Sequence, residues 1–327
     1  MYSQRSRKDP LTKHYHRHRW LTALSVSVIL SVALYLVVLI SADASRVLDA
    51  ARRLSASGWC AVLALSLGNY ALRFVRWHLY LRRLGHRIPW PRHLAIYISG
   101  FAMTTTPGKA GEAIRSLYLH ARGVPYPVSL AALFSERLVD LLSVLALAAI
   151  GIAALGVSGT WVAIAGAIGL IAVLLVRSPT IVALTARMPI SHDRLAHWRN
   201  HFVHLLQSSA SLLEPRLLIA ALLLGVVSWG AEGVGLHVIA ESLGLTVSLP
   251  RAVGIYALAM LGGAASLVPG GLGGAEAVMA GLLAASGAGV PEAVAATLIC
   301  RAATLWFAIL LGMIAMGVLQ VRKTWQA

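Results

Sequence analysis

Long apolar stretches recur along the chain and alternate with short polar, basic segments. The apolar stretches cover residues 21–40, 58–75, 127–154, 161–176, 217–240 and 292–321. Most of them approach the ~20 residues that an α-helix needs to cross a bilayer. A content of 58% hydrophobic and 12% charged residues, with a mean hydropathy of +0.76, agrees with this pattern. We therefore predict an all-α polytopic membrane protein with about six spans.

Two further apolar stretches, residues 93–122 and 251–287, are interrupted by proline and glycine. The interruptions carry Pro107, Gly108 and Gly111 in the first stretch and Pro269, Gly270 and Gly273 in the second. Proline removes a backbone donor and glycine favours a turn, so a continuous helix is not expected in either stretch. Broken backbone at membrane depth is tolerated only where protein or a wet cavity surrounds it. We predict that both stretches are re-entrant hairpins.

Basic residues gather between the apolar stretches and give the chain a formal net charge of +16. Because basic loops tend to stay in the cytoplasm, their positions indicate the orientation of the spans. Cytoplasmic signals are the tail at 1–20, the segment that runs from Arg73 and Arg76 to Arg92, the loop at 177–216 and the tail at 322–327. Both termini are therefore predicted to be cytoplasmic, and the second hairpin to open on the side opposite to the first. The charge favours an anionic membrane surface, and not nucleic acid, as its partner.

The loop at 177–216 contains apolar residues at helical spacing. They are Leu195, Trp198, Phe202, Leu205 and Leu206. This spacing predicts an amphipathic helix that lies on the membrane surface. His197, His201 and His204 share a neighbouring face, and we interpret them as solvated because no carboxylate or thiol pattern completes a metal site.

The two halves of the transmembrane domain at 21–321 show the same order of features. In the units at about 58–155 and 217–321, Asn69-Tyr70 matches Ser228-Trp229, Pro107-Gly108 matches Pro269-Gly270, and Arg137 matches Arg301. Each unit reads as a span, a re-entrant hairpin and a second span, with additional spans outside the units. The charge bias gives the units opposite orientations. Inverted repeats with broken helices at mid-membrane are typical of transporters.

Ionisable residues within the apolar stretches are the candidates for substrate binding or translocation, because each needs a partner or water. They are Lys109, Glu112, Arg115, Glu136, Arg137, Asp140, Glu232, Glu276 and Arg301. Glu112 and Arg115 are one helical turn apart and can pair. Glu136 and Asp140 share a face, and Arg115 or Arg301 could supply the opposite charge. These groups could bind a substrate or could be ion pairs that lock the bundle.

The mixture of signs suits a ligand that carries both charges, or a phosphate bound by arginines that carboxylates brace. We predict translocation of a polar lipid, such as a phospholipid, with the head group in a polar groove. Movement would be downhill or coupled to an ion gradient through Glu136 or Asp140. No Gly-x-Ser-x-Gly, HExxH or Walker pattern is present, so we expect no enzymatic activity, cofactor or metal. A small-solute or ion transporter and a membrane partner of a lipid-synthesis enzyme are the alternatives.

Several motifs together resemble one family. They are Arg73–Gly85, the run from Pro107 to Arg115, the run from Ser135 to Asp140, and Pro269 through Glu276 followed by Arg301. Over roughly residues 20–320 the chain is similar to the flippase-like transmembrane region of bacterial lysylphosphatidylglycerol synthase. The resemblance implies lipid translocation in the bacterial cytoplasmic membrane, with Glu112, Arg115, Glu136, Arg137, Asp140, Glu276 and Arg301 as site residues. No soluble aminoacyltransferase domain is expected in a chain that ends at Ala327.

Overall fold

The computed structural model describes residues 44–106, 111–155, 158–188, 193–266 and 268–324. The predicted basic tail and the first predicted span, at 21–40, lie outside these residues. Pro107, Gly108 and Lys109 of the first interruption also lie outside them. Every regular element in the described part of the chain is helical.

The helices follow one another without a domain break. The α-helices are α2 (Ala44–Arg52), α3 (Ala56–Arg83), α4 (Trp90–Ser99), α5 (Ile114–His120), α6 (Tyr126–Leu155), α7 (Thr160–Arg177), α8 (Pro179–Arg187), α9 (Asp193–Leu212), α10 (Pro215–Ser242), α11 (Leu249–Ala265), α12 (Gly274–Ala285), α13 (Val290–Arg301) and α14 (Phe307–Thr324). Short 3-10 segments, η1 (Gly100–Met103) and η3 (Pro269–Gly271), lie in the two interrupted stretches. A π-helical segment, η4 (Ala302–Trp306), joins α13 to α14.

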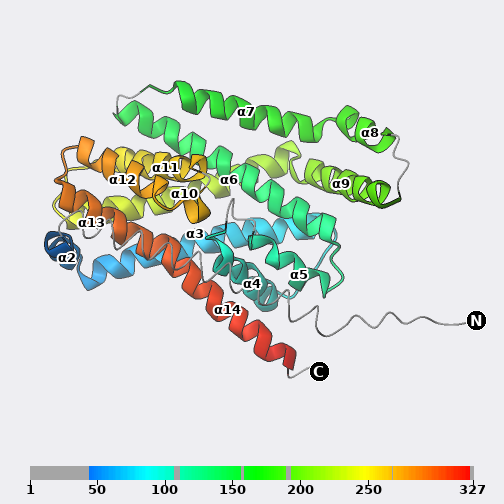
Figure 1. Ribbon diagram of the computed structural model, residues 1–327, viewed down its shortest axis with the longest axis horizontal. Helices are drawn as coiled ribbons and strands as arrows, with labels where there is room; N and C mark the ends of the chain where they lie inside the picture. Colours follow the sequence, from blue (N-terminus) through cyan, green and yellow to red (C-terminus); the bar gives the residue numbers. More distant parts are fainter. Residues whose placement is uncertain (1–43, 107–110, 156–157, 189–192, 267, 325–327) are drawn as a thin grey trace, which may run out of the picture.

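Five segments among the described residues are long and apolar enough to cross a membrane, by length and composition. They are α3, α6, α7, α10 and Val290–Val321, which comprises α13, η4 and most of α14. Each coincides with a predicted span, so the prediction of an all-α polytopic membrane protein is confirmed. In Figure 1, α7 runs roughly horizontally along the top of the molecule, and α6 runs obliquely below it.

α3 is longer than the sequence predicts, and its arginines are inside the bundle. The span was expected to end near residue 75, but the helix continues to Arg83. Only 6% of Arg73 and 1% of Arg76 is exposed, so these two arginines lie inside the bundle, and the cytoplasmic location of the segment that they begin stays a prediction. Trp77 and Tyr80 are fully buried, because they lie on the same packed face of the helix as the two arginines.

α3 and α10 occupy matching positions in the two predicted repeat units. Each is 28 residues long and ends at a Leu-Gly pair, in which Gly85 and Gly244 have φ values of +84° and +81°. Glycine adopts this conformation without the steric cost that a side chain would bring. The side-chain amide of Asn69 donates a hydrogen bond of 2.8 Å to the carbonyl of Ser228, the position that the repeat pairs with it. The inverted repeat itself stays a prediction.

The second interrupted stretch breaks into shorter helices at the predicted place, whereas in the first the described residues show η1 ending at Met103 and α5 beginning at Ile114, with Pro107 and Gly108 outside them. In the second stretch Gly270, Gly271 and Gly273 have φ values of +69°, +67° and +81°, so α11 and α12 cannot form one helix. Figure 1 shows α4 and α5 in the right-hand half of the molecule and α11 and α12 in the left-hand half. The breaks meet, since a Cβ atom added at Gly270 would lie 3.4 Å from Cα of Thr105. Their entry into the membrane stays a prediction.

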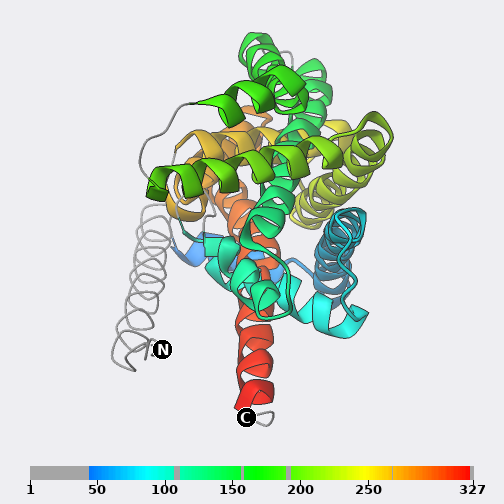
Figure 2. The same cartoon turned by 90° about the vertical axis from the view of Figure 1, so that its right-hand side faces the viewer.

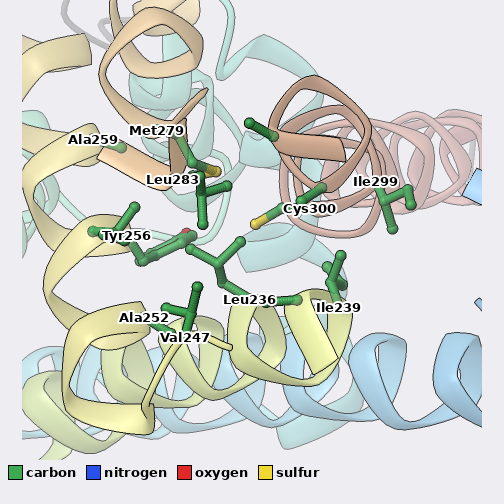
Figure 3. Close-up of a cluster of buried hydrophobic side chains, with 14 of the residues drawn as sticks. Leu236, Ile239, Val247, Ala252, Tyr256, Ala259, Met279, Leu283, Ile299 and Cys300 are labelled. Carbon is green, nitrogen blue, oxygen red and sulfur yellow. The ribbon is translucent and has the colours of Figure 1, made fainter. Parts of the chain in front are cut away.

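An apolar core fixes the second hairpin against its neighbours. Figure 3 shows Leu236 and Ile239 of α10, Tyr256 of α11, Met279 and Leu283 of α12, and Cys300 of α13 around one interior space. Full burial of each aliphatic side chain of this size contributes about 1.5–3 kcal/mol. α6 joins this core where it crosses α11, and a side chain at Gly151 would collide with the Cα atom of Gly254. The core therefore holds the end of α13 in a fixed place.

The last span is not a continuous α-helix. The π-helical segment η4 begins directly after Arg301. The Tyr70 hydroxyl on α3 donates a hydrogen bond of 2.6 Å to the carbonyl of Thr304 within η4. Beyond η4, α14 crosses η1 so closely that a side chain at Gly312 would collide with the backbone of Ala102. The last span therefore contacts α3 through η4 and contacts the first interrupted stretch through α14.

The amphipathic stretch of the loop at 177–216 forms α9. In Figure 2, α9 runs across the side of the molecule that faces the viewer. Leu206 is buried, whereas 72% of Trp198 and 51% of Phe202 is exposed. Large exposed apolar side chains of this kind fit a membrane surface, although that placement stays a prediction.

Candidate functional site

Four arginines and three carboxylates lie together where α3, α5 and α6 meet. This charge cluster consists of Arg73 and Arg76 of α3, Glu112 and Arg115 at the start of the α5 region, and Glu136, Arg137 and Asp140 of α6. Six of these residues are buried, and 24% of the Arg137 side chain is exposed. The formal charge of the cluster is +1. Charges at this depth persist only when they are paired and hydrogen-bonded.

Glu136 lies at the centre of the cluster. Its Oε2 atom is 2.9 Å from Nη1 of Arg115, and its Oε1 atom is 3.1 Å from Nη2 of Arg137. The Tyr97 hydroxyl donates a hydrogen bond of 2.8 Å to Oε1. Tyr97 also packs against the guanidinium of Arg115, which lies 4.2 Å from the ring centroid. The carboxylate is therefore held by two cations and a hydroxyl.

Asp140, one turn further along α6, has a similar set of partners. It forms a short ion pair with Arg76, and its Oδ2 atom lies 3.4 Å from Nη2 of Arg73 and 3.3 Å from Nη2 of Arg137. The indole N–H of Trp229 on α10 donates a hydrogen bond of 3.1 Å to Oδ1. This bond connects the charge cluster to the second half of the chain.

The structure brings together most, but not all, of the candidates in the way expected. Glu112 and Arg115 form the ion pair predicted from their spacing, and Arg115 also reaches Glu136. Arg137 follows Glu136 on α6, and its Nη2 atom contacts both Glu136 and Asp140. Of the two arginines considered as counter-charges for these carboxylates, Arg115 pairs with Glu136, whereas Arg301 pairs with Glu276.

Arg301 instead braces the break of the second hairpin. Its Nε atom is 2.7 Å from Oε1 of Glu276, and its Nη2 donates a hydrogen bond of 3.1 Å to the carbonyl of Gly270. Oε2 of Glu276 accepts a hydrogen bond of 2.7 Å from the backbone N–H of Gly273, at the start of α12. A carboxylate satisfies free backbone donors at a helix N-terminus. The Glu276–Arg301 pair therefore holds the backbone at Gly270, before the end of the break, and at Gly273, where α12 begins.

Residues that the sequence reasoning missed complete the site. Arg73 and Arg76 were assigned to a surface segment, although the apolar residues that follow them indicate that the helix continues. Trp229 and Tyr97 carry no charge, so they could not be selected as intramembrane ionisable groups. Within the described residues, no group of three or more His, Cys, Asp or Glu side chains is placed to hold a metal ion.

A cavity of about 260 Å³ lies between the charge cluster and the break of the second hairpin. Arg137 and Asp140 line one side of it, and Arg301, Gly270 and Gly271 line the other. Most of the remaining wall is apolar. Arg137 has the most exposed side chain of the charge cluster, at 24%, although its Nη2 atom lies within 3.5 Å of carboxylate oxygens of Glu112, Glu136 and Asp140.

Several apolar spanning helices around a buried charge cluster define this protein as a multi-pass membrane protein. The family described as "Lysylphosphatidylglycerol synthase TM region" matches residues 24–312. The match covers most of the chain, and the chain belongs to this family. The resemblance noted from the motifs is thereby confirmed.

Two curated relatives add to this result. A "UPF0104 membrane protein" from Methanothermobacter thermautotrophicus is 25% identical over 311 residues, which cover 87% of this chain and 90% of the relative. "Glycosyltransferase AglD" from Haloferax volcanii is 36% identical over 93 residues, which cover 28% of this chain. The matched part is 15% of the length of that glycosyltransferase.

Proposed function

We propose that this protein moves a polar lipid from one leaflet of the membrane to the other. In this proposal the phosphate of the head group binds in the cavity between Arg137 and Arg301, while the acyl tails stay in the bilayer. The observation that carries the proposal is the meeting of two guanidinium groups, one from each half of the chain, at a mostly apolar cavity. The bacterial cytoplasmic membrane and cytoplasmic termini stay predictions.

The chemistry of the two arginines supports a phosphate ligand. A guanidinium presents parallel N–H donors that match two phosphate oxygens. Asp140 and Glu276 hold these arginines in place, since each carboxylate forms an ion pair with one of them. The carboxylates also reduce the net positive charge, which weakens binding enough to allow release. A transported ligand needs such a moderate affinity, because a tightly held one would not leave.

The charge cluster itself has a different role in this proposal. Arg76 and Arg115 are 1% exposed and bound to carboxylates, so they stabilise the helix bundle and leave substrate contact to Arg137. We propose that no chemical reaction accompanies translocation and that no cofactor is needed. Movement is then driven by the lipid gradient or by an ion gradient.

Lipid movement can be measured with the purified protein in proteoliposomes that contain a trace of head-group-labelled phospholipid. A membrane-impermeant quencher reports the fraction of the label in the outer leaflet over time. We expect the wild-type protein to move the label, and Arg137→Met and Arg301→Met to slow the movement at least tenfold, as for a lost charge-assisted contact of about 1.5–3 kcal/mol.

Arg83→Met is the matched control, because Arg83 pairs with Glu214 at a site where both side chains are about half exposed. It should move lipid at the wild-type rate. Equal rates for all three variants would remove the basis of the cavity assignment. Uptake of a soluble solute without lipid movement would instead support a small-solute transporter.

A second candidate function is favoured by the match to Glycosyltransferase AglD. In that relative, a stretch similar to part of this chain belongs to a much longer protein. The chain could therefore act as the membrane partner of a lipid-modifying enzyme. This candidate requires that Arg137→Met and Arg301→Met leave the cellular function intact while an enzyme co-purifies with the protein.

A further inference from the structure

Glu232 is the buried carboxyl group that the charge cluster does not use. It lies in the middle of α10, and 3% of its surface is exposed. It forms no ion pair with any described residue, whereas Glu112, Glu136, Asp140 and Glu276 each have an arginine partner. Its hydrogen bond to a described residue comes from the hydroxyl of Ser66 on α3, at 2.9 Å from Oε2.

The groups that face Glu232 come from three neighbouring helices. α3 supplies Ser66, Tyr70 and the more distant charge of Arg73. α11 supplies Tyr256, and α13 supplies Cys300. Figure 3 shows that Tyr256 and Cys300 point toward the same interior space. Arg73 is already paired with Asp140 and Glu136, so its charge is shared with two other carboxylates.

A small cavity of about 50 Å³ is lined by Glu232 and by residues of the substrate site. Its wall includes Arg73 and Glu112 of the charge cluster, Trp229 of α10, and Arg301 of α13. Trp229 and Arg301 also line the larger cavity, so the two spaces share a wall. A polar space of this size holds one or a few water molecules, which can carry a proton.

We propose that Glu232 is the proton-binding site through which lipid translocation responds to a pH gradient. The inference rests on the proposed function. In the step, the carboxylate of Glu232 takes up one proton to become a carboxylic acid, and the same proton leaves when the carboxylate forms again. Uptake removes one negative charge from the wall of the small cavity, which Arg73 and Arg301 also line, so it strengthens phosphate binding in the larger cavity. Binding is reciprocal, so a bound phosphate in turn favours the protonated form.

Glu232 fits this role better than Glu136 or Asp140, the two carboxyl groups for which the sequence suggested coupling. Each of those two groups lies within 4.0 Å of at least three arginines, which stabilise the charged form. Glu232 is as deeply buried but has no cation at ion-pair distance among described residues. Burial without a cation disfavours the carboxylate form, so Glu232 takes up a proton more readily than the two carboxyl groups that arginines surround.

The test compares lipid movement in proteoliposomes with and without an imposed pH gradient. Wild-type protein should move the labelled phospholipid faster with the gradient, and Glu232→Gln, which resembles the protonated form, should move lipid at one rate under both conditions. Glu241→Gln is the matched control, because Glu241 lies on the same helix with 65% of its side chain exposed, and it should keep the gradient response. Ser66→Ala keeps the carboxyl group and should shift the pH of half-maximal rate.

A second measurement does not depend on transport. A hydrophobic carbodiimide reacts with protonated buried carboxyl groups, so peptide mass spectrometry should find a modification at Glu232 that increases as the pH falls. Lipid movement with an unchanged gradient response in Glu232→Gln overturns the inference and leaves the proposed function intact. Replacement of the pH gradient by a sodium gradient with equal effect also overturns it. Absence of lipid movement in the wild type defeats the proposed function, and absence of labelling at Glu232 then defeats the proton site independently.

Discussion

Replacement of Arg115 by methionine tests whether the buried charges hold the helices together. Arg115 is 1% exposed, forms ion pairs with Glu112 and Glu136, and packs on the ring of Tyr97. Methionine fills similar volume without a charge, so the variant takes the Arg115 partner away from both Glu112 and Glu136, and among the described residues Glu112 keeps a 3.5 Å contact to Arg137. Removal of one partner from a buried pair costs about 3–5 kcal/mol. We expect a loss of free energy of unfolding in this range.

The loss can be measured by titration of the purified protein with a denaturing detergent, with tryptophan fluorescence as the signal. A double-mutant cycle separates the pair from the packing. Arg115→Met combined with Glu112→Gln should lose about 1–3 kcal/mol less than the two single losses together, because the two residues contact each other and the second substitution removes no further Arg115–Glu112 interaction. Glu136 still has Arg137 and the Tyr97 hydroxyl in the double variant.

The exposed pair Arg83–Glu214 supplies the control for this cycle. Its atoms are 2.7 Å apart, as close as the buried pairs, but each side chain is about half exposed. Arg83→Met should therefore change the free energy of unfolding by no more than about 1 kcal/mol. If Arg115→Met also stays within about 1 kcal/mol of the wild type, the cluster does not stabilise the bundle and the reasoning from burial is refuted.

Two further predictions concern the backbone. Gly151→Leu should destabilise the protein by about 3 kcal/mol or more, because any side chain there collides with Gly254 on α11. Gly166→Ala is the control, because the space around Gly166 is open, and it should be neutral in the same unfolding assay. Gly270→Ala should lower the free energy of unfolding by about 1–2 kcal/mol, because φ is +69° at this residue. The variant should also slow lipid movement, since Arg301 donates a hydrogen bond to the Gly270 carbonyl. Lipid movement at the wild-type rate despite reduced stability would show that the hairpin break is not needed for transport.

Local patterns predicted the helices and the breaks well. Span positions follow from apolar stretches, and the break around Gly270 follows from residues that disfavour helix. The Glu112–Arg115 pair was also within reach, because both partners lie on one turn. These features depend on residues that are close together in the sequence, so they can be predicted from a single sequence.

Contacts between distant segments could not be predicted in the same way. The end of α3 was placed too early because two arginines resemble a membrane boundary when their partners on α6 are unknown. Arg301 had several carboxylates to choose from, and only the packing of α12 against α13 selects Glu276. A charged residue in the membrane interior is expected to have a partner, but only the fold determines which residue that partner is.

The π turn after Arg301 determines which side of the last helix meets the first hairpin. Each residue added to or removed from a helix rotates everything beyond it by about 100°. A chain one residue shorter within Ala302–Trp306 would therefore direct Gly312 away from Ala102 and bring a bulkier neighbour to the crossing. The π-helical turn therefore sets the rotation of α14 relative to α13. With this rotation Arg301 faces the break of the second hairpin, and Gly312 faces Ala102 in the first half of the chain.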